Sequence, residues 1–137
     1  MLVKAKLTQL ESLESLEVLW NPQSYRIERR TAFSVARVPG SARSVLQGAA
    51  GGEERFSTRL FLDSSPAEGA ARDLRPWVSR LEGWAAPMAG SGLPPGILFH
   101  WGSGRFRGVM ESLDEEWVAF DPDGTPIRAW LDLVLIR

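Results

Sequence analysis

The sequence has no cysteine and only one histidine among its 137 residues. The first absence excludes disulfide bridges, thiol catalysis and cysteine metal sites. The single histidine, His100, lies between Phe99 and Trp101, and no second histidine exists to complete a triad or a metal cluster. We therefore expect His100 to have a structural or surface role, and we expect neither a cofactor nor a bound metal.

An excess of charge of one sign is also missing, as are long apolar runs. Lys plus Arg (16) nearly cancel Asp plus Glu (17), so no strong field attracts nucleic acid or an anionic membrane. No stretch approaches the roughly 20 apolar residues of a spanning helix, and the lysine-containing start lacks the apolar core of a secretory signal. We expect no nucleic-acid partner, no membrane insertion, synthesis in the cytoplasm, and one domain over residues 1–137.

The clearest pattern lies in residues 94–137, where four apolar runs are separated by turn signals. The runs cover 97–101, 105–112, 116–120 and 126–137. Glycine-rich 102–104 and Asp121-Pro122-Asp123-Gly124 are typical of hairpin turns. The pattern predicts a four-strand antiparallel meander.

The closing run has two distinct faces. One face, Ile127 to Leu135 in steps of two, is apolar throughout and is expected to face the core. The other face begins with polar residues and ends apolar. Its large apolar members are Trp130, Val134 and Ile136. We expect these three to contact another subunit or another part of the fold, such as the helix.

Earlier in the chain, alternation predicts strands and one stripe predicts a helix. The expected strands cover 3–7, 16–20, 25–30 and 55–62. Within a helical segment at 66–84, the pattern Ser65-Pro66-Ala67-Glu68 resembles a capping box. The apolar stripe there consists of Leu74, Trp77, Val78, Leu81 and Trp84. We expect a short turn before Pro76 and a helix after it that stops at Gly83.

Residues 31–54 lose this periodicity and are expected to form an extended irregular loop. Such a long loop in a compact domain is functional, ordered by a partner, or simply flexible. Its apolar content favours subunit contact over free flexibility. The residues concerned are Phe33, Val35, Val38, Val45 and Leu46.

These elements predict a mainly β fold with one helix, a sandwich or barrel in which the helix covers an open edge or end. The acidic residues Glu111 and 114–116 are expected in a solvated turn rather than as paired catalytic carboxylates. Asp121 and Asp123 lack the acidic residue that would close a calcium loop. The sequence therefore favours a protein that is not an enzyme.

The six tryptophans offer an alternative function. Trp20, Trp77 and Trp84 fall on predicted core faces. Trp101, Trp117 and Trp130 remain available for an exposed platform. The alternative is a β-sandwich that binds a glycan or another small ligand through these three side chains.

The order and spacing of six segments resemble the contractile injection system tube-protein family. The segments are Lys4-Ala5-Lys6-Leu7, residues 18–25 (VLWNPQSY), residues 56–63 (FSTRLFLD), residues 95–102 (PGILFHWG), residues 106–112 (FRGVMES) and residues 120–129 (FDPDGTPIRA). The resemblance covers almost the whole chain. It implies a phage tail-tube-like fold of two packed antiparallel sheets with one helix.

The resemblance also implies a structural role in a contractile injection system or phage-tail-like particle. The expected assembly is a hexameric inner-tube or baseplate adaptor ring, which joins the tube protein to the trimeric hub-spike. Assembly is expected in the bacterial cytoplasm, within a particle that can be released from the cell. Many family members continue into a peptidoglycan-binding LysM module; this sequence ends at Arg137, so cell-wall binding is not among the expectations.

Overall fold

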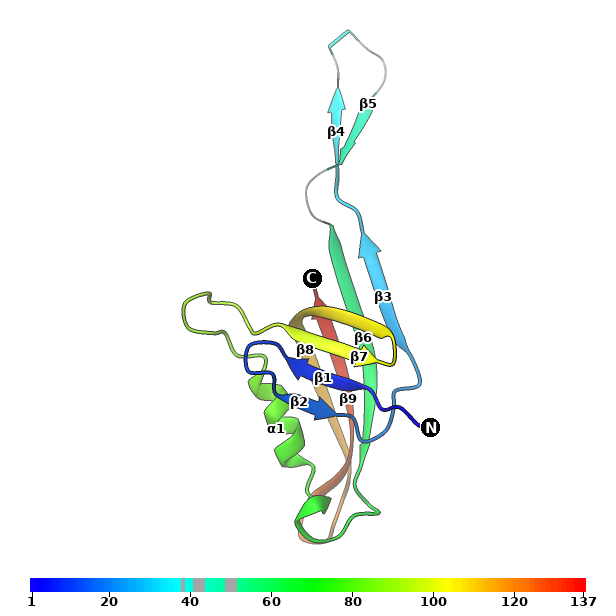
Figure 1. Cartoon of the computed structure of the whole chain (residues 1–137), viewed down its shortest axis with the longest axis vertical. Coiled ribbons are helices and arrows are strands. Elements are labelled where there is room, and N and C mark those ends of the chain that lie inside the picture. The colour runs from blue at the N-terminus through cyan, green and yellow to red at the C-terminus, as the bar shows by residue number, and fades with distance from the viewer. Residues whose placement is uncertain (38, 41–43, 49–51) are drawn as a thin grey trace.

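The protein is mainly β with one α-helix, as the sequence predicts. The computed structural model describes residues 1–37, 39–40, 44–48 and 52–137, with the backbone alone considered for 33–37 and 44–48. The strands are β1 Lys6–Gln9, β2 Ser15–Glu17, β3 Tyr25–Arg30, β4 Phe33–Arg37, β5 Ser44–Gly48, β6 Glu53–Asp63, β7 Ile97–Trp101, β8 Gly104–Phe120 and β9 Pro126–Ile136. A 3-10 helix, η1, covers Gly69–Arg72 and the α-helix, α1, covers Arg75–Gly83 (Figure 1).

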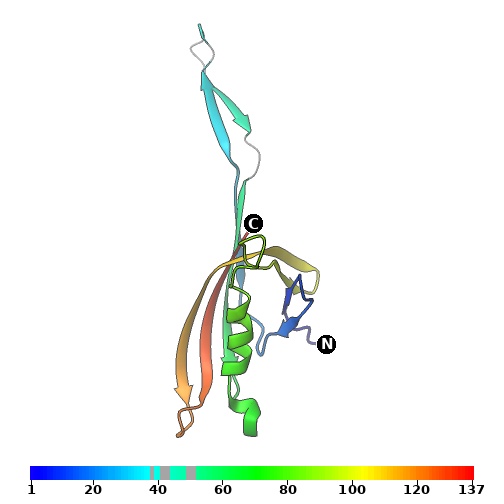
Figure 2. The same ribbon diagram turned by 90° about the vertical axis from the view of Figure 1, so that its left-hand side faces the viewer.

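Seven strands form one antiparallel sheet in the order β2-β1-β7-β8-β9-β6-β3. The expected pair of separate sheets is therefore wrong for the described residues, and the sheet is open because β2 and β3 end it without pairing to each other. Its two halves nevertheless face each other (Figure 2). The ring centroids of Phe56 on β6 and Phe99 on β7 lie only 4.6 Å apart across the interior. One bent sheet thus encloses the core as two sheets would.

Strand β8 makes this bend possible because it belongs to both halves. Its first five residues pair with β7, and from Val109 onward it pairs with β9. The predicted break between the second and third runs of the meander is therefore wrong. Pairing continues through Asp114 and Glu115, and an irregularity between Met110 and Ser112 resets the alternation of faces. Carboxylates on the outer side of a strand remain solvated, so no turn is needed to expose them.

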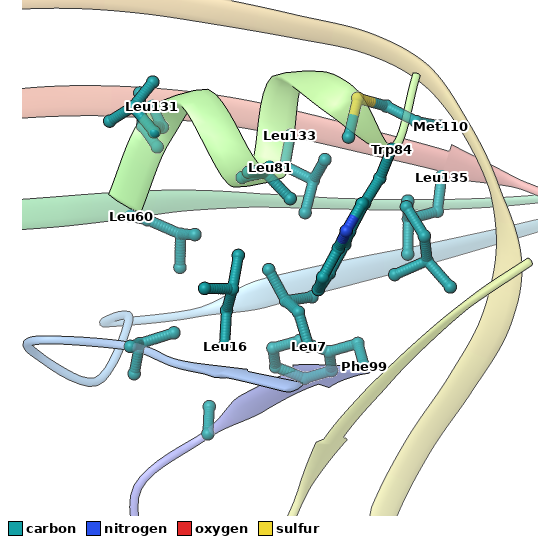
Figure 3. Close-up of a cluster of buried hydrophobic side chains, with 14 of the residues drawn as sticks. Leu7, Leu16, Leu60, Leu81, Trp84, Phe99, Met110, Leu131, Leu133 and Leu135 are labelled. Atoms are coloured by element: carbon teal, nitrogen blue, oxygen red, sulfur yellow. The ribbon is translucent and has the colours of Figure 1, made fainter. Parts of the chain in front are cut away.

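The core lies between the two halves of the sheet and is covered by α1. Figure 3 shows Leu81 and Trp84 among the leucines of β9. The core face predicted for the last strand is largely confirmed, since Leu131, Leu133 and Leu135 have no exposed surface. Burying each leucine contributes roughly 1.5–3 kcal/mol, which fixes the register of β9.

The helix begins one residue before the position expected and ends where expected. Pro76 falls in the first turn of α1, where its missing N–H costs nothing, and the helix ends at Gly83. The predicted capping box does not form, because Glu68 precedes the 3-10 helix and makes no capping hydrogen bond with its side chain. Arg72 instead ties this segment to the turn after β8 through two hydrogen bonds to Asp121, at 2.9 and 2.6 Å.

The segment 31–54 contains a hairpin rather than an irregular loop. Strands β4 and β5 pair antiparallel from Phe33 opposite Gly48 to Arg37 opposite Ser44. They follow the β3–β6 ladder, which ends with Arg30 opposite Glu53. Figures 1 and 2 show the β4–β5 hairpin projecting beyond the end of the main sheet, away from the helix and the core.

Candidate functional site

The outer face of β9, defined here by Trp130, Val134 and Ile136, lies on the outside of the sheet. All three side chains are half-buried. Helix α1 packs on the opposite face with the leucines of β9, so it does not cover them (Figure 3). Of the two contacts expected for these residues, the one with the helix is therefore wrong, while the one with another subunit stays a prediction.

Trp130 is held in place by two residues of the neighbouring strand β6. The ring centroid of Phe61 lies 4.6 Å from that of Trp130, and the guanidinium carbon of Arg59 lies 4.4 Å from the indole centroid. Arg59 is itself oriented by Glu116, with N and O atoms 3.4 Å apart, and by Asp132 at 3.5 Å. This stacking presents a rigid aromatic and charged surface.

Each member of the outer β9 face lines a hollow. The largest, of about 510 Å³, is lined by Trp20, Asn21, Pro22, Gln23, Ser24, Arg59, Phe61, Asp63 and Trp130. Val134 lines a hollow of about 240 Å³ beside Ser57, and Ile136 one of about 370 Å³ beside Arg107 and Val109. Hollows alternating with half-buried apolar side chains are typical of surfaces that fit a partner.

The other predicted contact residues belong to the projecting hairpin. In its ladder Val35 lies opposite Leu46, Val45 lies opposite Ala36, and Phe33 lies opposite Gly48. Val38 is outside the described residues. The fold therefore places the predicted contact residues at two separate sites, the hairpin and the body of the sheet, and does not unite them in one patch.

The chemistry around His100 fits a surface role. Its Nε2 lies 3.4 Å from the hydroxyl of Thr8. Burial, together with the nearby positive charges of Arg105 and Lys6, holds the pKa of His100 below its usual value. Within the described residues, no group of three or more acidic or histidine side chains is arranged to hold a metal ion.

One carboxylate pair was missed by the sequence reasoning. Burial raises the pKa of Glu115 on β8, and the neighbouring carboxylate Glu82 of α1 raises it further. The indole Nε1 of Trp117 donates a hydrogen bond to Glu115 at 3.3 Å, which opposes this shift. Glu115 faces inward because the irregularity between Met110 and Ser112 resets the alternation of β8, so reading this segment as a turn concealed the pair.

The tryptophans do not form the predicted platform. Trp101 and Trp117 pack against the core, whereas Trp130 lies on the outer face. Trp84 is buried as predicted and Trp77 partly so, but Trp20 is half exposed because the strand β2 ends at Glu17 and the chain bends before Trp20. Trp20 and Trp130 instead line the same hollow.

The structure is thus a β protein with half-buried apolar side chains on an outer strand face and with a projecting hairpin. No helix in the described part of the chain is both long and apolar enough to cross a membrane. The family model for the contractile injection system tube protein matches residues 2–137, and the chain belongs to that family. No curated protein matches the sequence. The family expected from the six sequence segments is thus confirmed.

Proposed function

We propose that the protein forms a hexameric ring that acts as an inner-tube or baseplate adaptor, linking the tube protein to the trimeric hub-spike. Membership of the tube-protein family supports a structural role in a contractile injection system. The observation that supports the proposal is the separation, on one subunit, of the projecting β4–β5 hairpin and the outer β9 face, the two places where contact residues are predicted.

Different contact sites on one subunit favour a head-to-tail arrangement. When the patch on one side of a subunit binds a different patch on the next, the contacts repeat, and they form a ring when the rotation between neighbours closes after a whole number of subunits. The open edges at β2 and β3 provide further unpaired backbone groups for such contacts. The hairpin extends past the body and is placed to reach a subunit above or beside the ring.

This function is mechanical and needs no cofactor. Rings assemble in the bacterial cytoplasm by contact between subunits, and then stack between the tube and the spike. The particle that contains them is released from the cell. Binding energy is gained by burying the outer β9 face and the hairpin residues Phe33, Val35, Val38, Val45 and Leu46.

Imaging of the purified protein with its tube and hub-spike partners tests this proposal. We expect negative-stain electron microscopy to show sixfold rings, and native mass spectrometry to give six copies per ring. The partners belong in the mixture because ring closure on the spike is part of the proposed role. A protein that stays monomeric and binds neither partner would contradict it.

The hollow beside Trp130 favours a second candidate function, the binding of a glycan or another small ligand. Trp20 and Trp130 supply aromatic surface, and Gln23 and Ser24 supply polar groups at its rim. Tryptophan fluorescence during titration with a glycan panel discriminates the two functions. Saturable changes lost in Trp130→Ala but retained in Trp117→Ala would support ligand binding.

A further inference from the structure

Three cationic side chains, Lys6 on β1 and Arg105 and Arg107 on β8, lie on the outer face of the sheet on either side of His100 on β7. The register places Lys6 opposite His100 and His100 opposite Arg105, and Arg107 follows two residues later on β8. We call these four residues the basic face. The residues next to them along each strand point to the opposite side of the sheet. These neighbours include Leu7, Phe99 and Phe106, which are buried in the core. The basic face is therefore turned outward by the same register that builds the core.

The cations of the basic face are not matched by an equal number of nearby carboxylates in the described part of the chain. Within the described residues, Lys6, Arg105 and Arg107 form no ion pair, whereas nine other arginines do, from Arg26 to Arg137. Glu17 lies opposite Lys6 and offsets only part of this charge. Besides burial, Arg105 and Lys6 both lower the pKa of His100, which lies between them, so positive charge at this face is repelled. A partner that supplies carboxylates would relieve this repulsion.

The same strand carries the opposite charge at its other end. On the outer side of β8 and β9, the carboxylates Glu111, Asp114, Glu116 and Asp132 form what we call the acidic face. Asp114 lies opposite Asp132, and Glu116 lies opposite Trp130. Arg55 and Arg59 neutralise part of this charge, and Asp114 has no ion pair among the described residues. Trp130 adjoins the acidic face, next to Glu116 and Asp132, so apolar and charged surface lie side by side there.

The bend in β8 turns these two faces toward opposite sides of the molecule. In Figure 2 the β1–β2–β7 half lies on one side, the β8–β9 ends lie on the other, and α1 lies between them. The outward normals of the two halves therefore diverge. The molecule therefore has a basic face on one side and an acidic face on the other. Two different, complementary surfaces of this kind suit a head-to-tail contact between identical subunits.

We propose that the basic face of one copy of this chain docks on the acidic face of a second copy. This inference rests on the proposed ring and identifies which surfaces meet in it. The charged rim steers the two copies and fixes their orientation, while Trp130 and the side chains around it supply apolar contact. Because the rim is solvent-exposed, association should weaken as salt screens it, over a distance of about 8 Å at physiological ionic strength.

Two charge-reversal variants test the contact. Arg105→Glu/Arg107→Glu makes both faces acidic, and Asp114→Lys/Glu116→Lys makes both faces basic. All four positions are exposed, so each variant should fold, which circular dichroism checks. Arg75→Glu/Arg80→Glu on the exposed side of α1 makes the same change in charge as Arg105→Glu/Arg107→Glu, away from both faces, and is the matched control for that variant.

We expect sedimentation velocity to show that each variant alone self-associates at least about tenfold more weakly than the wild type and the control. An equimolar mixture of the two variants should regain association, because each then meets a complementary face on the other. Unimpaired assembly of either variant alone would overturn the proposal, and so would a mixture that gains nothing.

The single histidine gives a second readout that does not need a closed ring. In labelled Asp114→Lys/Glu116→Lys protein, the His100 Hε1 signal should shift when unlabelled Arg105→Glu/Arg107→Glu protein is added, but not when more of the same variant is added. No shift at any concentration would overturn the docking. Rings formed normally by the wild type and by both variants would leave the proposed function intact and remove only this contact.

Discussion

At the scale of single residues, Gly108 shows how closely β8 and β9 approach. A Cβ at this buried position would lie 2.4 Å from the carbonyl oxygen of Ile136 and 3.1 Å from a ring carbon of Phe106. Gly108→Ala should therefore lower the free energy of unfolding by about 1–3 kcal/mol, because the backbone must shift. Urea denaturation measures this loss.

The control for this substitution is Gly83→Ala. A Cβ on Gly83, the last residue of α1, meets no atom within 4 Å. Alanine there should be neutral or stabilise by up to about 1 kcal/mol. Equal effects of the two substitutions would contradict the close approach of the strands at Gly108.

Glu115 predicts a pH dependence of stability. Since burial and Glu82 raise its pKa in the folded state, the native protein binds this proton more tightly than the unfolded chain. The contribution of Glu115 to stability is therefore complete below the ordinary value of 4.5 and is lost as pH rises through its folded pKa. Glu115→Gln should be more stable than the wild type at pH 7, with a difference that disappears near pH 4.

Denaturant unfolding at a series of pH values measures this difference. Glu116→Gln is the matched control, because Glu116 is exposed on the outer side of the same strand. Gln retains an oxygen that accepts the hydrogen bond from Trp117, so loss of that bond does not obscure the result. A stability gain for Glu115→Gln that is equal at pH 4 and pH 7 would contradict the proposed carboxylate pair.

At the scale of elements, the sequence predicted what depends on local alternation. β3 begins and ends where its pattern does, the inner face of β9 is buried, and α1 follows its apolar stripe. These elements could be predicted from the sequence because the period of the apolar residues directly reflects which side of the element is buried. The continuity of β8 could not be predicted in this way, because a bulge shifts its alternation and its cluster of carboxylates has the composition of a turn.

The hairpin and the single bent sheet were hidden for other reasons. The glycine- and serine-containing segment around β4 and β5 has a loop composition, and its pairing depends on the register inherited from β3 and β6. A sandwich and a bent open sheet use the same alternating strands, so the pattern cannot separate them. The sequence indicated that Trp130, Val134 and Ile136 share the outer face of β9, but it did not indicate that Trp20 lines a hollow with Trp130 or that charged side chains of several strands lie side by side.

The hairpin can be removed without touching the body. Because Arg30 lies opposite Glu53, an Asn-Gly turn in place of residues 31–52 closes the β3–β6 ladder with a standard two-residue connection. We expect this variant to keep its melting temperature within a few degrees, since the residues of the core lie outside the deleted segment. Ring stacking with the tube and spike partners should be lost in electron micrographs. Unfolding of the monomer would show that the hairpin stabilises the body instead.

At the scale of the whole molecule, the small net charge hides an uneven distribution of charged side chains over the surface. The chain carries a net charge of −1, yet the basic face lies on the β1–β7 half of the sheet and the acidic face on the β8–β9 half. The bend in β8 converts this difference along one strand into a difference between two sides of the molecule. A neutral subunit with complementary sides can associate with its own copies, while its small net charge gives it no long-range attraction for polyanions.

The two faces of β9 separate folding from assembly in adjacent residues. Ile136→Glu lies on the outer face opposite Arg55, so the new carboxylate is solvated and the monomer should lose about 1 kcal/mol or less. Ring formation should fail because a charge replaces apolar contact.

Leu135→Glu is the control for this substitution. The side chain of Leu135 has no exposed surface, and an unpaired buried carboxylate there should lower the free energy of unfolding by more than about 4 kcal/mol, enough to unfold a domain of ordinary stability. Thermal denaturation and native mass spectrometry of both variants measure the two effects separately. Unfolding of Ile136→Glu would make the outer face internal, and normal rings from it would exclude Ile136 from the subunit contact.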